Sequence, residues 1–177
     1  MHKLNFYFID NFDKDHIKNL PRNIGIVYRN YNQKYNEHDI LSMKKFCLAE
    51  RKRFYLANNI YLVEKLRLDG AYIPAFNKDL KIKRLKIKNY TLLGSAHNIK
   101  EINQKIKQKV DYLFISPIFK NTKTKKKLGI IKFNILAQKF NQNIVALGGI
   151  NKKNLKIINN IKNYSFASIS YIKNTTK

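Results

Sequence analysis

Two adjacent glycines, one serine and one arginine could together hold a phosphate group. Gly148 and Gly149 lie between an apolar segment and a helical one. Glycine lets backbone N–H groups approach an anion closely. Ser170, further along the chain, offers a hydroxyl, and Arg29 offers a planar guanidinium suited to phosphate oxygens. These residues predict a phosphate site, with an ordinary tight turn at the glycine pair as the alternative.

A second short segment, GSAH at 94–97, could supply proton transfer. The Ser95 hydroxyl can bind an anionic oxygen. The imidazole of His97 can act as an acid or a base near neutral pH. The alternative is that His97 merely begins the helix that follows.

The third feature is a basic run, KNTKTKKK at Lys120–Lys127, which includes Lys125 and could fold over a polyphosphate. A solvated surface loop is the alternative. The whole chain has 36 Lys and Arg residues against 11 Asp and Glu, a formal charge of +25. Nucleic-acid binding is one interpretation of that charge. However, the lysines are spread along the chain and arginine is scarce, so a compositional bias toward A/T-rich codons explains the charge as well.

These candidate residues need a scaffold, and the apolar pattern predicts one. Segments rich in apolar, β-branched and aromatic residues alternate with amphipathic ones, which indicates a β/α protein. Strands are predicted at 4–10, 23–31, 54–59, 70–75, 90–96, 111–119, 143–150 and 164–172, and helices at 38–53, 60–68, 98–110, 128–140 and 151–163. The connection at 76–89 shows no clear pattern.

Eight β/α units over 177 residues predict one compact (β/α)8 barrel domain spanning 1–177. The alternative is an open doubly wound sheet, although no GxGxxG follows the first strand. In a barrel, chemistry sits at the carboxyl ends of the strands, where Arg29, Asn59, Ser95, Gly148 and Ser170 fall. A single cysteine excludes a disulfide scaffold, and no apolar run is long enough to span a membrane. A cytoplasmic protein is therefore expected, with an oligomeric state that the sequence does not specify.

Several motifs, in order, resemble the thiamine phosphate synthase and TenI family of compact (β/α)8 barrels. LLGSAHNIKEI is similar to the family's G-x-S-x-H-x-x-x-E segment, and DYLFISPIF to its aspartate-tyrosine strand that ends in proline and an aromatic residue. VALGGINKKN resembles the G-G-I-x-x-x-N turn, and ASISYI resembles the closing strand. DGAYIP is similar to a D-G-x-H segment, with Tyr72 in place of the histidine.

The resemblance implies an activity and a role for each site residue. The synthase joins 4-amino-5-hydroxymethyl-2-methylpyrimidine diphosphate to a thiazole phosphate and releases diphosphate with Mg²⁺ assistance. It implies that Gly148, Gly149 and Ser170 hold the thiazole phosphate. It also implies that Arg29, Ser95 and Lys125 bind the diphosphate.

The sequence departs from the family at the metal positions. These positions fall on Asn59 and on Asn77 or Asp79, and an amide oxygen is a poorer Mg²⁺ ligand than a carboxylate. The glutamine and lysine of the family's Q-x-R-x-K strand fall on Val27 and Tyr31. The TenI branch, whose members tautomerise a thiazole carboxylate phosphate without metal, therefore stays open. His97 is the acid or base in that reading, and a non-catalytic phosphate-binding or nucleic-acid-binding barrel is the third possibility.

Overall fold

The protein is a closed barrel of eight parallel strands in the order β1 to β8, as a computed structural model of the chain shows. The structure describes residues 3–120, 127–162 and 164–173. The strands are β1 (Asn5–Ile9), β2 (Ile24–Tyr28), β3 (Phe54–Ala57), β4 (Gly70–Ile73), β5 (Thr91–Ala96), β6 (Tyr112–Ile115), β7 (Asn143–Leu147) and β8 (Ser165–Ser168). The predicted (β/α)8 barrel is therefore confirmed, and the open sheet is wrong because β8 pairs with β1.

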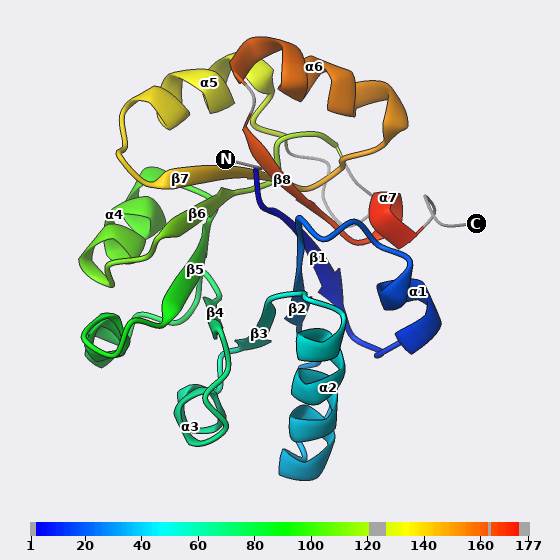
Figure 1. Ribbon diagram of the computed structural model, residues 1–177. Coiled ribbons are helices and arrows are strands. Elements are labelled where there is room, and N and C mark those ends of the chain that lie inside the picture. The colour runs from blue at the N-terminus through cyan, green and yellow to red at the C-terminus, as the bar shows by residue number, and fades with distance from the viewer. Residues whose placement is uncertain (1–2, 121–126, 163, 174–177) are drawn as a thin grey trace.

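Helices follow the strands and surround them (Figure 1). They are α1 (Lys14–Lys18), α2 (Glu37–Ala49), α3 (Ile60–Lys65), the 3₁₀ helix η1 (Leu80–Lys86), α4 (Ile99–Lys107), α5 (Ile130–Gln138), α6 (Lys152–Lys162) and α7 (Ser170–Lys173). Asparagines begin several of them: the Asn98 side chain accepts from the Glu101 N–H at 3.0 Å, as its position before an apolar face predicts.

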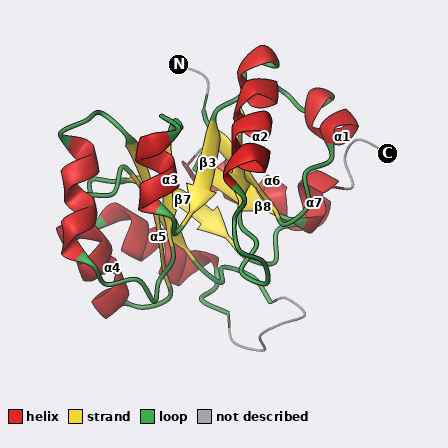
Figure 2. Cartoon of the chain, turned by 90° about the horizontal axis from the view of Figure 1, so that it is seen from below, coloured by secondary structure: helices red, strands yellow, loops and turns green. Residues whose placement is uncertain are grey.

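Three local features differ from the sequence prediction. The unassigned connection at 76–89 contains η1, whose Ile82 and Leu85 are buried against the barrel. The short helix α1 was not predicted. The last strand ends at Ser168, and Ser170 begins α7, which lies beside α1 in both views (Figures 1 and 2). The apolar pattern of this segment is continuous, so it did not indicate that a helix begins at Ser170.

Two apolar layers hold the barrel together. The outer layer lies between strands and helices, and it contains side chains such as Ile26, Leu56 and Ile102. The inner layer fills the barrel itself and is largely aromatic, with Phe6, Phe8, Tyr55, Tyr72 and Phe114 among its members. Because side chains alternate along a strand, one face of each strand feeds the inner layer and the other feeds the outer one.

No helix in the described parts of the chain combines the length and the apolar character needed to cross a membrane.

Candidate functional site

A cavity of about 500 Å³ opens at the carboxyl ends of β1, β2, β7 and β8. It brings together four of the residues that the sequence predicted for phosphate binding, namely Arg29, Gly148, Gly149 and Ser170. These positions are up to 141 residues apart in the chain, and barrel closure makes them neighbours. This is the region in which (β/α)8 barrels commonly bind phosphate.

The glycine pair turns the chain sharply at the end of β7. Gly148 and Gly149 have φ angles of +94° and +69°, which other L-residues rarely adopt. A Cβ atom on Gly149 would lie 2.6 Å from the carbonyl oxygen of Lys120. The turn therefore requires glycine for two reasons, its left-handed backbone and its close packing against the loop that follows β6.

Hydrogen bonds fix this turn from both sides. The Phe119 N–H donates to the Gly148 carbonyl at 3.1 Å, which ties the loop after β6 to the turn. The Asn154 amide donates to the Gly149 carbonyl at 2.7 Å. The Asn151 side chain, in turn, accepts from the Lys153 and Asn154 N–H groups at the start of α6. Because Asn151 also lines the cavity, the positive end of the α6 dipole faces this region.

Arg29 reaches the cavity from the end of β2. Its backbone N–H donates to the Ile9 carbonyl at 2.7 Å, and its guanidinium lies over the Phe8 ring, 4.9 Å from the centroid. The guanidinium also lies close to the Tyr72 hydroxyl, and its charge opposes the rise in the Tyr72 pKa that burial causes. Stacking and hydrogen bonding thus hold the charge at the inner wall of the cavity. Lys120 adds a second cation there, and Asp10 a carboxylate.

Ser95 lies one layer deeper than the sequence suggested. Its side chain is 4% exposed and lies close to the Tyr72 hydroxyl, where it opposes the rise in the Tyr72 pKa that burial causes. It connects through Tyr72 to Arg29 and does not line the cavity. In this structure the Ser95 side chain is therefore buried beside Tyr72, and a direct contact with an anion in the cavity would require it to move.

His97 stands on the rim between β5 and β6, apart from the cavity lining. Its Nδ1 lies 3.0 Å from the Ser116 carbonyl oxygen, which can only accept. Nδ1 must therefore carry the proton when the ring is neutral, which leaves Nε2 as the basic nitrogen. The backbone N–H of His97 donates to Glu101 at 2.7 Å, so the helix start also holds the residue.

The residues at the implied metal positions do not fit Mg²⁺. The Asn59 Oδ1 accepts from the Leu62 N–H at 3.0 Å and so serves as the helix cap of α3. Asn77 donates its amide to the Asn58 Oδ1 at 2.6 Å and accepts from the Asp79 N–H at 2.9 Å. Their oxygens are thus engaged within the protein.

The Asp79 carboxylate fits no better. Its Oδ1 accepts from the Lys81 N–H at 2.8 Å. Across the described residues, no three or more His, Cys, Asp or Glu side chains gather, although one or two carboxylates together with substrate phosphates suffice for Mg²⁺.

The aromatic cluster behind the site, of which Phe8 lines the cavity, was not identified from the sequence. Phe8, Tyr72 and Phe114 form a cluster with centroid separations of 4.9 to 5.9 Å. Alternation along β1 could have indicated Phe8 as an inward residue, but nothing local pairs it with Arg29. Lys125 lies outside the described residues, and Lys120 lines the cavity among the members of the basic run that the structure describes.

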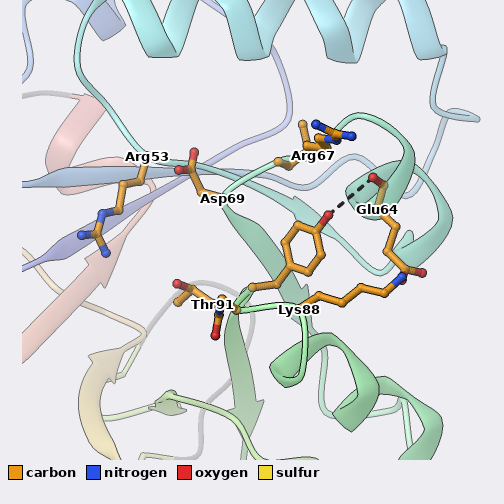
Figure 3. Close-up of a pocket in the computed structure, with 9 residues that line it drawn as sticks. Arg53, Glu64, Arg67, Asp69, Lys88 and Thr91 are labelled. Atoms are coloured by element: carbon orange, nitrogen blue, oxygen red, sulfur yellow. Dashed lines mark hydrogen bonds and ion pairs between the residues drawn. The ribbon is translucent and has the colours of Figure 1, made fainter.

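A second hollow, of about 710 Å³, lies at the opposite end of the barrel. Its lining comes from the segments that precede β3, β4 and β5 (Figure 3). Glu64 there accepts from Arg84 and Lys88 at 2.8 Å, and the Asp69 carboxylate accepts from the Phe54 N–H. Because several of its charges are already paired, this hollow offers less to an anionic substrate than the cavity at the carboxyl ends.

The fold is a (β/α)8 barrel with a cavity at the carboxyl ends of its strands. The chain belongs to the thiamine monophosphate synthase family, whose model matches residues 25–172. The resemblance identified from the sequence motifs is thereby confirmed.

Relatives of the chain are named thiamine-phosphate synthases. The chain is 26% identical over 148 residues to a thiamine-phosphate synthase of Prochlorococcus marinus subsp. pastoris, which covers 82% of this chain and 41% of the relative. It is 31% identical over 119 residues to that of Lysinibacillus sphaericus, which covers 65% of this chain and 56% of the relative. The chain thus spans about half or less of these relatives.

Solved structures agree on the fold. Thiamine phosphate pyrophosphorylase from Pyrococcus furiosus superposes with a TM-score of 0.74 at 15% identity, covering 95% of this chain and 85% of that one. A thiamine phosphate pyrophosphorylase from Bacteroides thetaiotaomicron gives 0.63 at 19% identity, with 98% and 85% coverage.

Proposed function

We propose that this protein is a thiamine phosphate synthase that joins hydroxymethylpyrimidine diphosphate to a thiazole phosphate. The observation that carries the proposal is the single cavity shared by Arg29, Gly148, Gly149 and Ser170. Two anions must be held close together in this reaction, and both a glycine turn and a guanidinium face the same space. Family membership and the names of the relatives support the same activity.

In the proposed reaction, the bond between the pyrimidine methylene carbon and the diphosphate oxygen breaks, and the electron pair leaves with the diphosphate. The thiazole nitrogen then forms a bond to that carbon with its own lone pair, so no proton or external electron is needed. Gly149 and Ser170 hold the thiazole phosphate. Arg29 and Lys120 stabilise the charge on the leaving diphosphate, which is the principal electrostatic demand of the step.

Magnesium supplies similar stabilisation where it is bound. We assign it no step in this chain, because the amides of Asn59 and Asn77 and the carboxylate of Asp79 have partners within the protein. Lys125 remains a candidate for the diphosphate on the strength of the motif resemblance alone.

A direct assay tests the proposal. Purified protein is mixed with both substrates, with and without Mg²⁺, and the product is oxidised to fluorescent thiochrome. Arg29→Lys keeps the charge but loses the planar fork and should reduce kcat more than it raises KM for the thiazole phosphate. Absence of product in both metal conditions, with a working synthase as control, would refute the synthase.

The second candidate is a TenI-type thiazole tautomerase. The orientation of His97 favours it, because the Ser116 carbonyl leaves Nε2 as a base at the rim. The same phosphate grip would serve that substrate. Proton exchange at the thiazole carboxylate phosphate, followed by NMR in deuterated water, tests this activity. Its loss in His97→Ala, with phosphate binding retained, would support the tautomerase.

A further inference from the structure

Two exposed aromatic side chains meet at the rim of the barrel. Tyr31 follows β2 and Phe76 follows β4, and their rings lie in edge-to-face contact with centroids 5.9 Å apart. Tyr31 is 51% exposed and Phe76 65% exposed. Since burial stabilises apolar side chains, an exposed pair of this kind contributes little to the core.

The pair stands at the same edge of the sheet as the candidate site. In a parallel barrel, the ends of β2, β3 and β4 lie side by side, so the loops after β2 and β4 flank the end of β3. Tyr31 is close to both Arg29 and Tyr72, which influence its pKa in opposite directions while burial raises it. Arg29 lines the phosphate cavity, so the aromatic pair and the cavity share a boundary residue.

The loop that carries Phe76 is firmly held. The Asn77 N–H donates to the Pro74 carbonyl at 3.1 Å, and the Asn77 amide donates to Asn58 at 2.6 Å. Beneath the loop, the buried Lys105 ammonium donates to the Pro74 and Asn77 carbonyls, both at 2.7 Å. A pre-organised aromatic surface loses little conformational freedom when a ligand binds.

We infer that Tyr31 and Phe76 form a stacking platform for the planar ring of the substrate, whose anionic group reaches Arg29. In the family's Q-x-R-x-K strand, the position of Tyr31 is a lysine, so this chain presents an aromatic ring where that pattern has a cation. Aromatic pairs accept a third ring in offset or edge-to-face geometry. Two side chains make too small an apolar patch for a protein partner. The inference rests on the proposed function for the identity of the ring, the aminopyrimidine.

Calorimetric titration of the purified full chain tests the platform with two probes. Hydroxymethylpyrimidine diphosphate carries the ring and the anion, whereas inorganic pyrophosphate carries the anion alone. We expect Phe76→Ala to weaken the pyrimidine probe about tenfold and pyrophosphate by less than about twofold. Phe76→Tyr, which keeps a ring, should retain the affinity. Leu48→Ala removes an equally exposed side chain from the far end of α2 and should change neither titration.

Each outcome decides the question. A loss confined to the pyrimidine probe supports the platform. Equal losses for both probes, no loss for either, or a wild-type protein that binds the pyrimidine probe no more tightly than pyrophosphate overturns it. Ring-dependent binding without product refutes the synthase and leaves the platform intact. Product formation with unchanged binding in Phe76→Ala does the reverse.

Discussion

Lys105 offers the sharpest test of how the loop after β4 is held. The side chain is fully buried, and its ammonium donates to the Pro74 and Asn77 carbonyls at 2.7 Å and to the Gln108 Oε1 at 2.9 Å. Gly94 makes room for it, since a Cβ atom there would lie 3.0 Å from the Lys105 Cδ. We expect Lys105→Met, which nearly preserves side-chain volume, to lower the free energy of unfolding.

The size of this decrease depends on which buried acceptors lose a hydrogen-bond donor. The Asn77 carbonyl keeps the Gln108 amide as a donor at 3.1 Å, and the Pro74 carbonyl keeps the Asn77 N–H. The buried Gln108 Oε1, in contrast, loses the ammonium. One buried acceptor left without its donor costs about 1–3 kcal/mol, and this is the expected loss at pH 7. Lys107→Met, on the exposed face of the same helix, should change stability by less than about 0.5 kcal/mol.

The pH dependence gives an independent check. Burial lowers the pKa of Lys105 from 10.5 to about 8. Between these values the unfolded chain binds a proton that the folded chain lacks, so this residue adds stability as pH rises. Lys105→Met lacks this gain in stability. The difference between its free energy of unfolding and that of the wild type should therefore widen from pH 7 to pH 10.

Urea unfolding followed by far-ultraviolet circular dichroism at pH 7, 8, 9 and 10 measures both effects. The comparison between the two methionine variants removes the general relief of charge repulsion, which affects both alike in so basic a chain. If Lys105→Met matches Lys107→Met at pH 7, or if its deficit shrinks as pH rises, the reasoning from burial and hydrogen bonding is refuted.

Three further predictions concern the candidate site. Gly149→Ala should destabilise the fold and weaken inorganic phosphate binding more than Gly129→Ala, because Gly129 has a similar positive φ but open space at its Cβ position; equal effects in calorimetry and unfolding would contradict the packing argument. His97→Gln should lower any tautomerase rate about 100-fold or more while leaving phosphate affinity unchanged, and a fully active variant in the NMR exchange assay would exclude His97 as the base. Wild-type protein should show no saturable Mg²⁺ binding by calorimetry, whereas the double variant Asn59→Asp, Asn77→Asp should bind Mg²⁺ through its new carboxylates. The double variant should still fold, because aspartate caps a helix as well as asparagine does. Tight Mg²⁺ binding by the wild type would contradict the conclusion that the amides do not fit the metal.

The barrel and much of the site could be predicted from sequence because their signals are local. Continuous apolar strands alternate with amphipathic helices, and only a few topologies accommodate eight such units. Arg29, Gly148 and Gly149 each follow a strand, and the carboxyl ends of parallel strands share one face. The prediction that these residues lie together needed no knowledge of side-chain contacts.

Other features depend on contacts between residues distant in the chain. Ser95 lies within β5 near its carboxyl end, yet its side chain is buried beside Tyr72 and does not line the cavity. The alternation of a strand specifies which way a side chain points, but not which inner side chains it meets. The start of α7 at Ser170 has a local cause, because the Ser168 Oγ accepts from the Tyr171 N–H at 3.0 Å, whereas the apolar pattern of the sequence continues past it.

The sequence by itself determined the eight-unit periodicity, the glycine turn and the amides at the metal positions, because each is a property of residue type or of spacing along one segment. Only the tertiary structure decided that Tyr31 meets Phe76, that Lys105 is buried beneath the loop after β4, and that Arg29 stacks on Phe8. The physical reason is barrel closure. It fixes the distances between side chains on different strands, and those distances set the burial, charge and hydrogen bonding on which binding depends.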